Sequence, residues 1–164
     1  MADEKKQGKK ELVHCFDCNQ MCCRTTVIEV DPPRSIRDHS DLLFYLYHFD
    51  TEIVVAKNSG KKEWFVEFMS PCRFLADGRC RIYEKRPLVC REYDMDGCEF
   101  NRPKAFTYIR TPEEYFQYLE RKGPKRILKK LKKTHLPDGG YPESAPADSI
   151  HAARTSIDRS RPSA

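Results

Sequence analysis

Eight cysteines in two groups constrain this chain more than any other feature of its sequence. Four of them fall within nine residues, and the other four are spread over residues 72–98. The eight are Cys15, Cys18, Cys22, Cys23, Cys72, Cys80, Cys90 and Cys98. Thiolates bind soft and borderline cations, and a CxxC spacing lets two sulfurs close around one ion. An even number of cysteines also permits a disulfide framework, so the count alone leaves both interpretations open.

The N-terminal residues favour metal over disulfides. Met1 to Lys10 contain no apolar stretch that could act as a secretory signal, and no segment is long and apolar enough to span a bilayer. We therefore expect a cytoplasmic protein whose thiols stay reduced. Cysteines that are reduced and this densely placed are expected to bind metal, and free thiols or redox switching are the remaining alternatives.

Length and charge limit the fold and the partners. The 164 residues suffice for one domain with tails, and 18 aromatic side chains allow a modest core that metal staples would strengthen. The net charge of +5 is unevenly distributed. Residues 12–120 carry 15 basic and 18 acidic side chains, whereas residues 121–135 carry eight basic and no acidic ones. The basic excess is therefore one local stretch.

Local patterns predict three strands. Residues 25–30 are β-branched and end at a proline pair, and residues 52–57 and 63–69 are strand-like on either side of a turn at Asn58-Ser59-Gly60-Lys61. The last two form an expected antiparallel hairpin. In its second strand, alternation should place Trp64, Val66 and Phe68 toward the core and Glu63, Phe65 and Glu67 on a wet face.

Helical patterns and composition complete the expected organisation. Apolar spacing predicts a helix over 35–49, with Ser35 or Asp38 as its cap, and Thr111-Pro112-Glu113-Glu114 is a helix start. Gly123-Pro124 should interrupt that helix before a second one. The fold class is thus α+β: a small cysteine-rich single domain with a short antiparallel hairpin, a few helices and a metal-stapled loop region. We expect disorder over 1–11, a metal-binding domain over 12–120, a basic amphipathic helix over 121–135 and a disordered tail over 136–164.

Helical geometry suggests how the first cysteine group is used. If residues 15–23 are helical, Cys15, Cys18 and Cys22 share one face and Cys23 points away from it. Three thiolates cannot complete a tetrahedral site. The missing ligand would come from Cys23 by local distortion or from the second group, which favours one site that bridges both groups over two separate ones.

Residues near the cysteines each allow two interpretations. Nearby arginines could lower thiolate pKa values and offset cluster charge, or they could be ordinary surface charges. They are Arg24, Arg73, Arg79, Arg81, Arg86 and Arg91. His14 could be a ligand, but a histidine beside eight available thiols is more often a bystander.

Three strings carry a resemblance to a known family. They are Cys15-x2-Cys18-x3-Cys22-Cys23, then Ser70-Pro71-Cys72-Arg73-Phe74-Leu75, and then GRCRIYEKRPLVCREY from Gly78 to Tyr93. Together they resemble the YkgJ-type cysteine-cluster proteins, also described as the CxxCxxCC or zinc- or iron-chelating domain, over about residues 12–102. The resemblance implies that all eight cysteines belong to one metal-binding unit. It also implies a relation to bacterial flagellin lysine methylases, which are similar in the cysteine cluster but longer.

The chain departs from the family form at one point. Asn19-Gln20-Met21 place three residues between the second cysteine and the Cys22-Cys23 pair, where the family form has two. On a helix, the extra residue changes which member of the pair faces the metal. The ligand within the pair is therefore open, as is the choice between zinc and iron.

Three functions of different classes follow. The first is a small cytosolic protein that holds zinc or iron, with a [4Fe–4S] cluster as one form, through its cysteines. The second is a metal- or Fe–S-dependent protein-modifying enzyme; Glu92, Asp94 and Asp96 are acid–base candidates, but no glycine-rich nucleotide loop is visible and no catalytic residue is assigned. The third is binding of nucleic acid, an acidic partner or a membrane surface by residues 121–135. For those residues, the alternative is a solvated helix whose apolar stripe packs on the core.

Overall fold

The computed structural model describes residues 12–14, 17–18, 20–58, 60–93, 95, 98, 100–101 and 106–141. The disorder predicted for residues 1–11, Cys15, and the part of the predicted tail after Tyr141 lie outside these residues.

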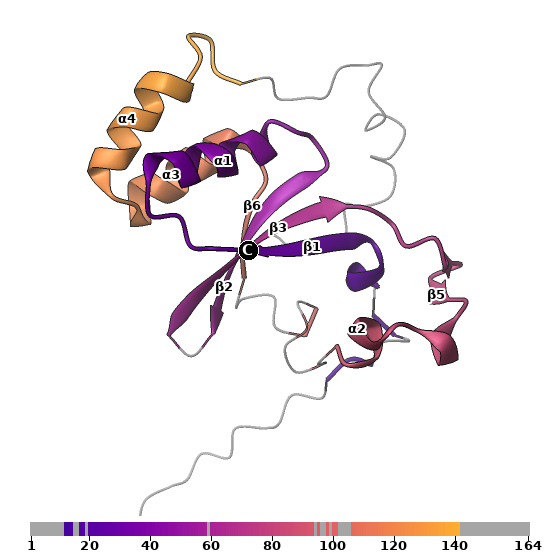
Figure 1. The fold of residues 1–164 in the computed structure, drawn as a ribbon. Coiled ribbons are helices and arrows are strands. Elements are labelled where there is room, and N and C mark those ends of the chain that lie inside the picture. Colours follow the sequence, from indigo (N-terminus) through magenta and orange to yellow (C-terminus); the bar gives the residue numbers. More distant parts are fainter. Residues whose placement is uncertain are drawn as a thin grey trace, which may run out of the picture.

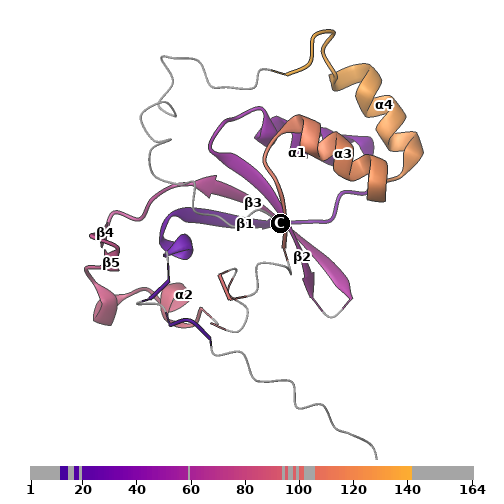
Figure 2. The same cartoon turned by 180° about the vertical axis from the view of Figure 1, so that it is seen from behind.

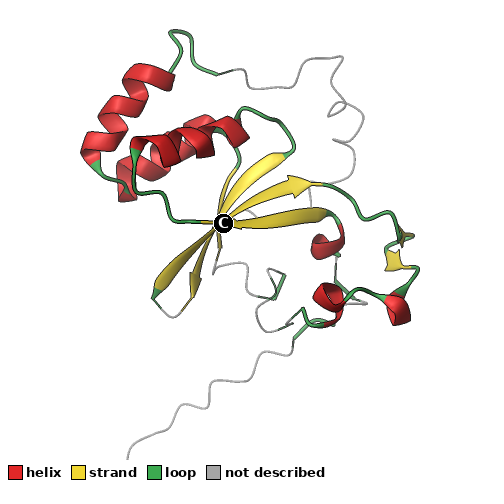
Figure 3. Cartoon of the chain, in the orientation of Figure 1, coloured by secondary structure: helices red, strands yellow, loops and turns green. Residues whose placement is uncertain are grey.

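Over the described residues, the chain forms a four-stranded sheet, a two-stranded ribbon and several helices (Figure 1, Figure 3). In chain order the elements are the 3-10 helix η1 (Met21–Cys23), β1 (Thr25–Val30), α1 (Ile36–Leu46), β2 (Thr51–Asn58), β3 (Lys61–Met69), β4 (Leu75–Ala76), β5 (Arg79–Cys80), the 3-10 helix η2 (Tyr83–Lys85), α2 (Leu88–Arg91), β6 (Phe106–Ile109), α3 (Pro112–Lys122) and α4 (Lys125–His135). The large sheet has the order β1-β3-β2-β6 with antiparallel neighbours. The prediction of a small α+β single domain is confirmed.

The predicted hairpin forms the centre of the sheet. β2 and β3 pair from Thr51 opposite Phe68 to Asn58 opposite Lys61. Gly60 in the connecting turn has a φ of +84°, which glycine adopts without a steric penalty. The predicted strand over residues 25–30 is β1, at one edge. The strand at the other edge, β6, was not predicted from the sequence.

The prediction that Glu67 lies on a solvent-exposed face of the hairpin is wrong. The Glu67 side chain has no solvent exposure, and Glu52, opposite it in β2, is 2 % exposed. The Arg110 Nε–H donates to Glu52 Oε2 at 3.0 Å and compensates part of the buried charge. Val54, on the same face of β2, is also buried. The sheet is therefore covered on both faces here, which strand alternation alone does not reveal.

Helix α1 begins where its capping residues predict. The Asp38 N–H donates to Ser35 Oγ, and the Ser35 N–H donates to Asp38 Oδ2 at 2.8 Å, which together form a capping box. The Ser35 hydroxyl, and after it the backbone N–H groups of Arg34 and Ser35, lower the pKa of Asp38 to about 2. Ser35 is therefore the cap, and Asp38 is its partner.

Helices α3 and α4 match the predicted pair. The Glu114 N–H donates to Thr111 Oγ1 at 3.2 Å at the start of α3, with Pro112 in the first turn. The helix ends at Gly123, where a Cβ would lie within 2.9 Å of Leu119 atoms, so only glycine fits. Pro124 then precedes α4. Within the described residues, none of the helices is long and apolar enough to cross a membrane.

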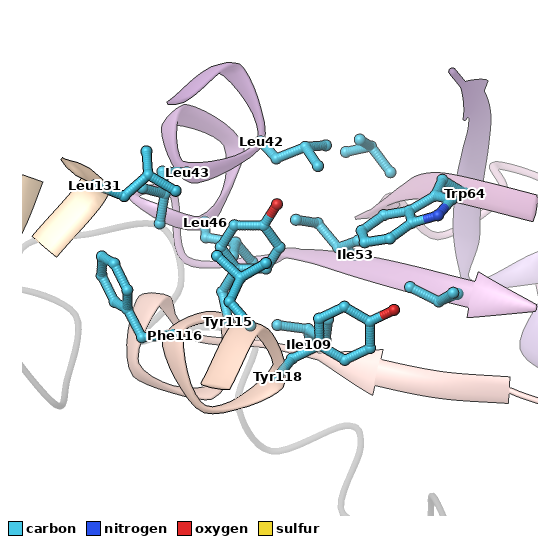
Figure 4. Close-up of a cluster of buried hydrophobic side chains, with 13 residues drawn as sticks. Leu42, Leu43, Leu46, Ile53, Trp64, Ile109, Tyr115, Phe116, Tyr118 and Leu131 are labelled. Carbon is cyan, nitrogen blue, oxygen red and sulfur yellow. The ribbon is translucent and has the colours of Figure 1, made fainter. Parts of the chain in front are cut away.

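The hydrophobic core lies between the sheet and the three long helices (Figure 4). Its buried side chains come from α1, β2, β3, β6, α3 and α4: Leu42, Leu43, Leu46, Ile53, Val55, Trp64, Val66, Ile109, Tyr115, Phe116, Tyr118, Leu119 and Leu131. Leu131 of α4 is fully buried, and Ile127 and Leu128 pack against the same cluster. The apolar stripe of the basic helix therefore belongs to the core. Among the residues between 69 and 108 that the structure describes, none belongs to this core.

The core extends beyond the last helix. Tyr141 is half-buried, and its ring is stacked on Phe116 with the centroids 6.5 Å apart. Its hydroxyl donates to the His135 carbonyl, and its N–H donates to Glu113 Oε1 at 3.2 Å. Residues 136–141, which the sequence assigned to a tail, thus include a side chain that packs on the folded domain.

One buried histidine in the core is expected to make the free energy of unfolding depend on pH. His39 of α1 is 2 % exposed, and its Nδ1 lies 2.6 Å from the hydroxyl of Tyr115 in α3. Burial lowers the pKa of His39, whereas the Asp38 carboxylate raises it by a smaller amount. Burial also raises the pKa of Tyr115, so this phenol stays neutral and can donate to the imidazole.

We therefore expect stability to fall as the pH drops below about 6.5, the ordinary histidine value. The unfolded chain binds a proton there while the folded chain does not, so the free energy of unfolding decreases until the lower folded pKa is reached. Urea denaturation at pH 8, 7, 6 and 5 would measure this. His39→Gln should flatten the difference between pH 7 and 5, and an unchanged pH dependence in that variant would contradict the assignment.

Candidate metal centre

The pairing of β1 with β3 brings the two cysteine groups to one place. β1 starts two residues after Cys23, β3 ends three residues before Cys72, and Thr25 lies opposite Met69. The pairing continues past the strand ends, because the Ser70 N–H donates to the Arg24 carbonyl at 2.9 Å and the Cys72 N–H donates to the Cys23 carbonyl at 2.7 Å. Cysteines 49 residues apart in the sequence thus meet at one corner of the sheet.

We call the described parts of residues 12–24 and 70–101 the cysteine lobe. In Figures 1 and 2, η1 and α2 lie side by side at the end of the sheet away from the three long helices, and β4 and β5 lie close by. The lobe therefore stands apart from the hydrophobic core.

The first cysteine group is not one helix over its described residues, so the condition under which Cys23 would point away from a shared helical face is not met there. Gln20 has a φ of +52°, which interrupts a right-handed helix, and only Met21–Cys23 form a 3-10 turn. The Gln20 N–H donates to Cys18 Sγ at 3.3 Å, and the Gln20 side-chain amide donates to the Cys18 carbonyl. Gln20 therefore shapes this segment, although the sequence showed it only as a spacer.

A tight ribbon positions Cys80 beside the first group. β4 and β5 are joined by Asp77 and Gly78, both with positive φ, as in a two-residue hairpin turn. Leu75 lies opposite Cys80, and the Leu75 N–H donates to the Cys72 carbonyl at 3.0 Å. A Cβ on Gly78 would lie 3.6 Å from Gln20 Oε1, so this turn lies near the N-terminal segment.

Arg86 orders the segment that carries Cys90. Its guanidinium carbon lies 3.6 Å from the centre of the Tyr83 ring, and its Nε–H donates to the Tyr83 carbonyl at 2.9 Å. A second donor of the same side chain reaches the Cys90 carbonyl at 3.4 Å. Among the arginines near the cysteines, Arg86 thus forms hydrogen bonds to the backbone carbonyls of Tyr83 and Cys90. The sequence alone did not predict this role.

Asn101 ties the segment before the first group to the loop that carries Cys98. Its side-chain oxygen accepts the Val13 N–H at 2.9 Å, and its amide donates to the Met95 carbonyl at 3.0 Å. The Cys98 N–H donates to the same Met95 carbonyl at 3.3 Å. Residue 13 therefore lies beside the Cys98 loop. Sequence reasoning did not single out Asn101, because both of its partners are backbone groups that leave no pattern in the sequence.

The electrostatics of Cys23 place it among cysteines of the second group. Burial raises the pKa of the Cys23 thiol above its ordinary value, and a hydrogen bond with the Cys22 side chain lowers it. Charge on Cys72, Cys80 and Cys90 raises the Cys23 pKa further. Repulsion of this kind between like charges requires proximity, and a bound cation would reverse its sign.

The described cysteines have the chemistry of metal ligands, but their side chains are not yet arranged around one ion. Seven cysteines are described and none is in a disulfide; Cys22, Cys72 and Cys90 are exposed, and Cys18, Cys23, Cys80 and Cys98 are half-buried. Within the described part of the chain, no three cysteine, histidine or carboxylate side chains already stand at metal-ligand spacing. An all-thiol donor set fits zinc or iron. Closing around an ion would require side-chain rotation within the lobe.

The other candidates lie at the margins of the lobe. His14 is exposed, and Arg73, Arg79, Arg81 and Arg91 are exposed as well, while Arg24 is half-buried. Glu92 is exposed, and Asp94 and Asp96 lie outside the described residues, as does Cys15.

Comparison with known proteins bears on the cysteine lobe directly. A family model named CxxCxxCC, described as "Putative zinc- or iron-chelating domain", matches residues 14–120. This range spans both cysteine groups, the four-stranded sheet and most of α3, and it ends before α4. Neither a curated protein nor a solved structure matches the chain.

Proposed function

Because the chain belongs to the CxxCxxCC family of zinc- or iron-chelating domains, we propose that its two cysteine groups hold one shared metal centre. The ligands would be drawn from all eight cysteines: Cys15, Cys18, Cys22, Cys23, Cys72, Cys80, Cys90 and Cys98. The observation that carries this proposal is the hydrogen bond from the Cys72 N–H to the Cys23 carbonyl at 2.7 Å, which brings the two cysteine groups together beside the paired ends of β1 and β3.

A shared centre explains the lobe better than two separate sites. The Cys72 N–H donates to the Cys23 carbonyl, so the backbone already joins the two groups. The described residues of segment 70–101 contribute nothing to the hydrophobic core, and Val89 is 75 % exposed. Bound metal would supply cohesion that apolar burial does not supply there, because metal-binding free energy becomes folding free energy.

The proposal implies a reducing compartment. Thiols ligate metal as thiolates and are lost as ligands when they form disulfides. We therefore place the protein in the cytoplasm, where thiols are kept reduced. An iron–sulfur cluster, held by cysteine thiolates, would also require protection from oxygen during isolation.

Anaerobic purification followed by metal analysis and visible absorption tests the proposal. We expect about one metal centre for each chain. Iron with inorganic sulfide and a brown colour would identify an Fe–S cluster, and colourless protein with zinc would identify a structural zinc site. Folded, fully reduced protein that takes up neither zinc nor iron would refute the metal centre.

A further inference from the structure

A strongly basic surface covers the helical side of the molecule, away from the cysteine lobe. It consists of Arg121, Lys122, Lys125, Arg126, Lys129, Lys130, Lys132 and Lys133, all of which are exposed. Residues 121–135 include no acidic side chain, whereas the preceding residues 12–120 have three more acidic than basic side chains. The excess of positive charge is thus concentrated in residues 121–135, and a local excess of this kind orients a protein toward a polyanion.

The packing of α4 determines which kind of polyanion fits. Leu131 is fully buried, and Ile127 and Leu128 pack against the core cluster. A helix that lies in a membrane surface needs its apolar face for the lipid. In α4 that face is already occupied by α1 and α3, so membrane insertion is disfavoured.

The exposed side of α4 also lacks the features of a protein-binding surface. Protein interfaces are enriched in aromatic residues and depleted in lysine, and their energy comes from buried anchors. Between residues 121 and 135, the exposed side chains are lysines, arginines, Pro124 and Thr134. This composition suits contacts to phosphates, which need charge and no shape-matched pocket.

The charges are available and suitably spaced. Lys132 Nζ donates to Glu120 Oε1 at 2.5 Å, whereas within the described residues Lys125, Arg126, Lys129, Lys130 and Lys133 form no ion pair. Lys125, Lys129 and Lys133 recur every four residues and form one stripe. An 11-residue helix is about 16 Å long, and duplex DNA presents one phosphate for each ~1.7 Å of its axis, so several phosphates face such a stripe.

We propose that this basic surface binds the phosphate backbone of nucleic acid without reading its sequence. No exposed asparagine, glutamine or aromatic side chain on α4 is available to recognise base edges or stack on bases. The surface lies outside the residues that match the CxxCxxCC family and does not depend on the metal centre.

Fluorescence anisotropy of the full-length, metal-loaded protein with labelled 20-base-pair duplexes of two unrelated sequences tests this proposal. We expect equal affinity for both sequences and a steep decline with salt. Changing Lys125, Lys129, Lys130 and Lys133 to glutamine should weaken binding at least about tenfold. It should also reduce the slope of log K against log salt by about 3 to 4, since each lost phosphate contact removes ~0.9.

A matched control removes four positive charges elsewhere. Arg34, Arg37, Lys57 and Lys61 are exposed and lie outside the basic surface, and changing them to glutamine should leave the salt slope unchanged. Changing the four α4 lysines to arginine should retain binding, and equal melting temperatures would exclude misfolding. Equal affinity of the glutamine variant, an equal loss in the control, or tighter binding to poly-glutamate or to phosphatidylserine vesicles would overturn the proposal.

Discussion

Replacing Cys23 with serine is expected to empty the metal centre and loosen the cysteine lobe while the helix–sheet core stays folded. Cys23 lies where the two groups meet, because its carbonyl accepts a hydrogen bond from the Cys72 N–H. The core is expected to stay folded because none of the described side chains between residues 69 and 108 belongs to it.

The extent of this loosening depends on which interactions other than metal binding stabilise the cysteine lobe. Phe74, Leu88 and Val89 are exposed, so little apolar burial opposes its opening. Structural zinc contributes on the order of 10 kcal/mol, far more than the few backbone hydrogen bonds there. Metal loss should therefore remove nearly all ordered structure from residues 71–98.

Hydrogen exchange locates the change. In Cys23→Ser, the amides of Leu75, Arg81 and Cys90, which donate to backbone carbonyls, should exchange rapidly, while those in β2 and α3 stay protected. Ser70→Ala is the control, because its hydroxyl lies 2.5 Å from that of Thr26 beside the lobe and is not a proposed ligand. Full metal content in Cys23→Ser would remove Cys23 from the ligand set. Unfolding of the core together with the lobe would show that both form one cooperative unit.

Ile53→Ala is expected to lower the free energy of unfolding by about 2–5 kcal/mol, the cost of truncating a fully buried aliphatic side chain. Ile53 has no solvent exposure, and β2 is paired on both sides at this position, with Val66 in β3 and Ile109 in β6. The surrounding strands cannot move inward to fill the space, so the cavity should persist. Urea denaturation of the metal-loaded protein measures the change.

The same row of the sheet provides a matched control. Ile28 of β1 also lies opposite Val66, but β1 is an edge strand and Ile28 is 52 % exposed. Ile28→Ala makes the identical chemical change and should cost no more than about 0.5–1 kcal/mol. Equal losses in the two variants would mean that residue burial in this sheet does not determine stability.

Elements with strong local signals were predictable from the sequence, and those that depend on distant partners were not. The cap at Ser35, the start at Thr111-Pro112 and the turn near Gly60 each reflect contacts within a few residues. β6 has only four residues, and its partner β2 lies some 50 residues earlier, so it left no periodic signal. Glu67 was misplaced for a similar reason, because its burial depends on what covers the second face of the sheet.

The candidate site likewise has features that the sequence predicts and others that it does not. The cysteines and their grouping are visible in the sequence, and the family match covers both groups. Their arrangement depends on the left-handed backbone at Gln20 and on the pairing of Thr25 with Met69, neither of which cysteine spacing encodes. The helical geometry considered for the first group therefore does not describe its backbone over the described residues, and the ligand within the Cys22-Cys23 pair stays open.

The position of the two groups at adjoining ends of β1 and β3 makes the metal centre sensitive to strand register. A two-residue slip of β1 along β3 preserves the inward and outward faces but displaces Cys23 from Cys72 by about 7 Å, while a zinc–sulfur bond is only ~2.3 Å long. A chain paired in the slipped register could not close the centre. Metal binding would thus selectively stabilise the native register of β1 and β3, since only correctly aligned strands retain the ion.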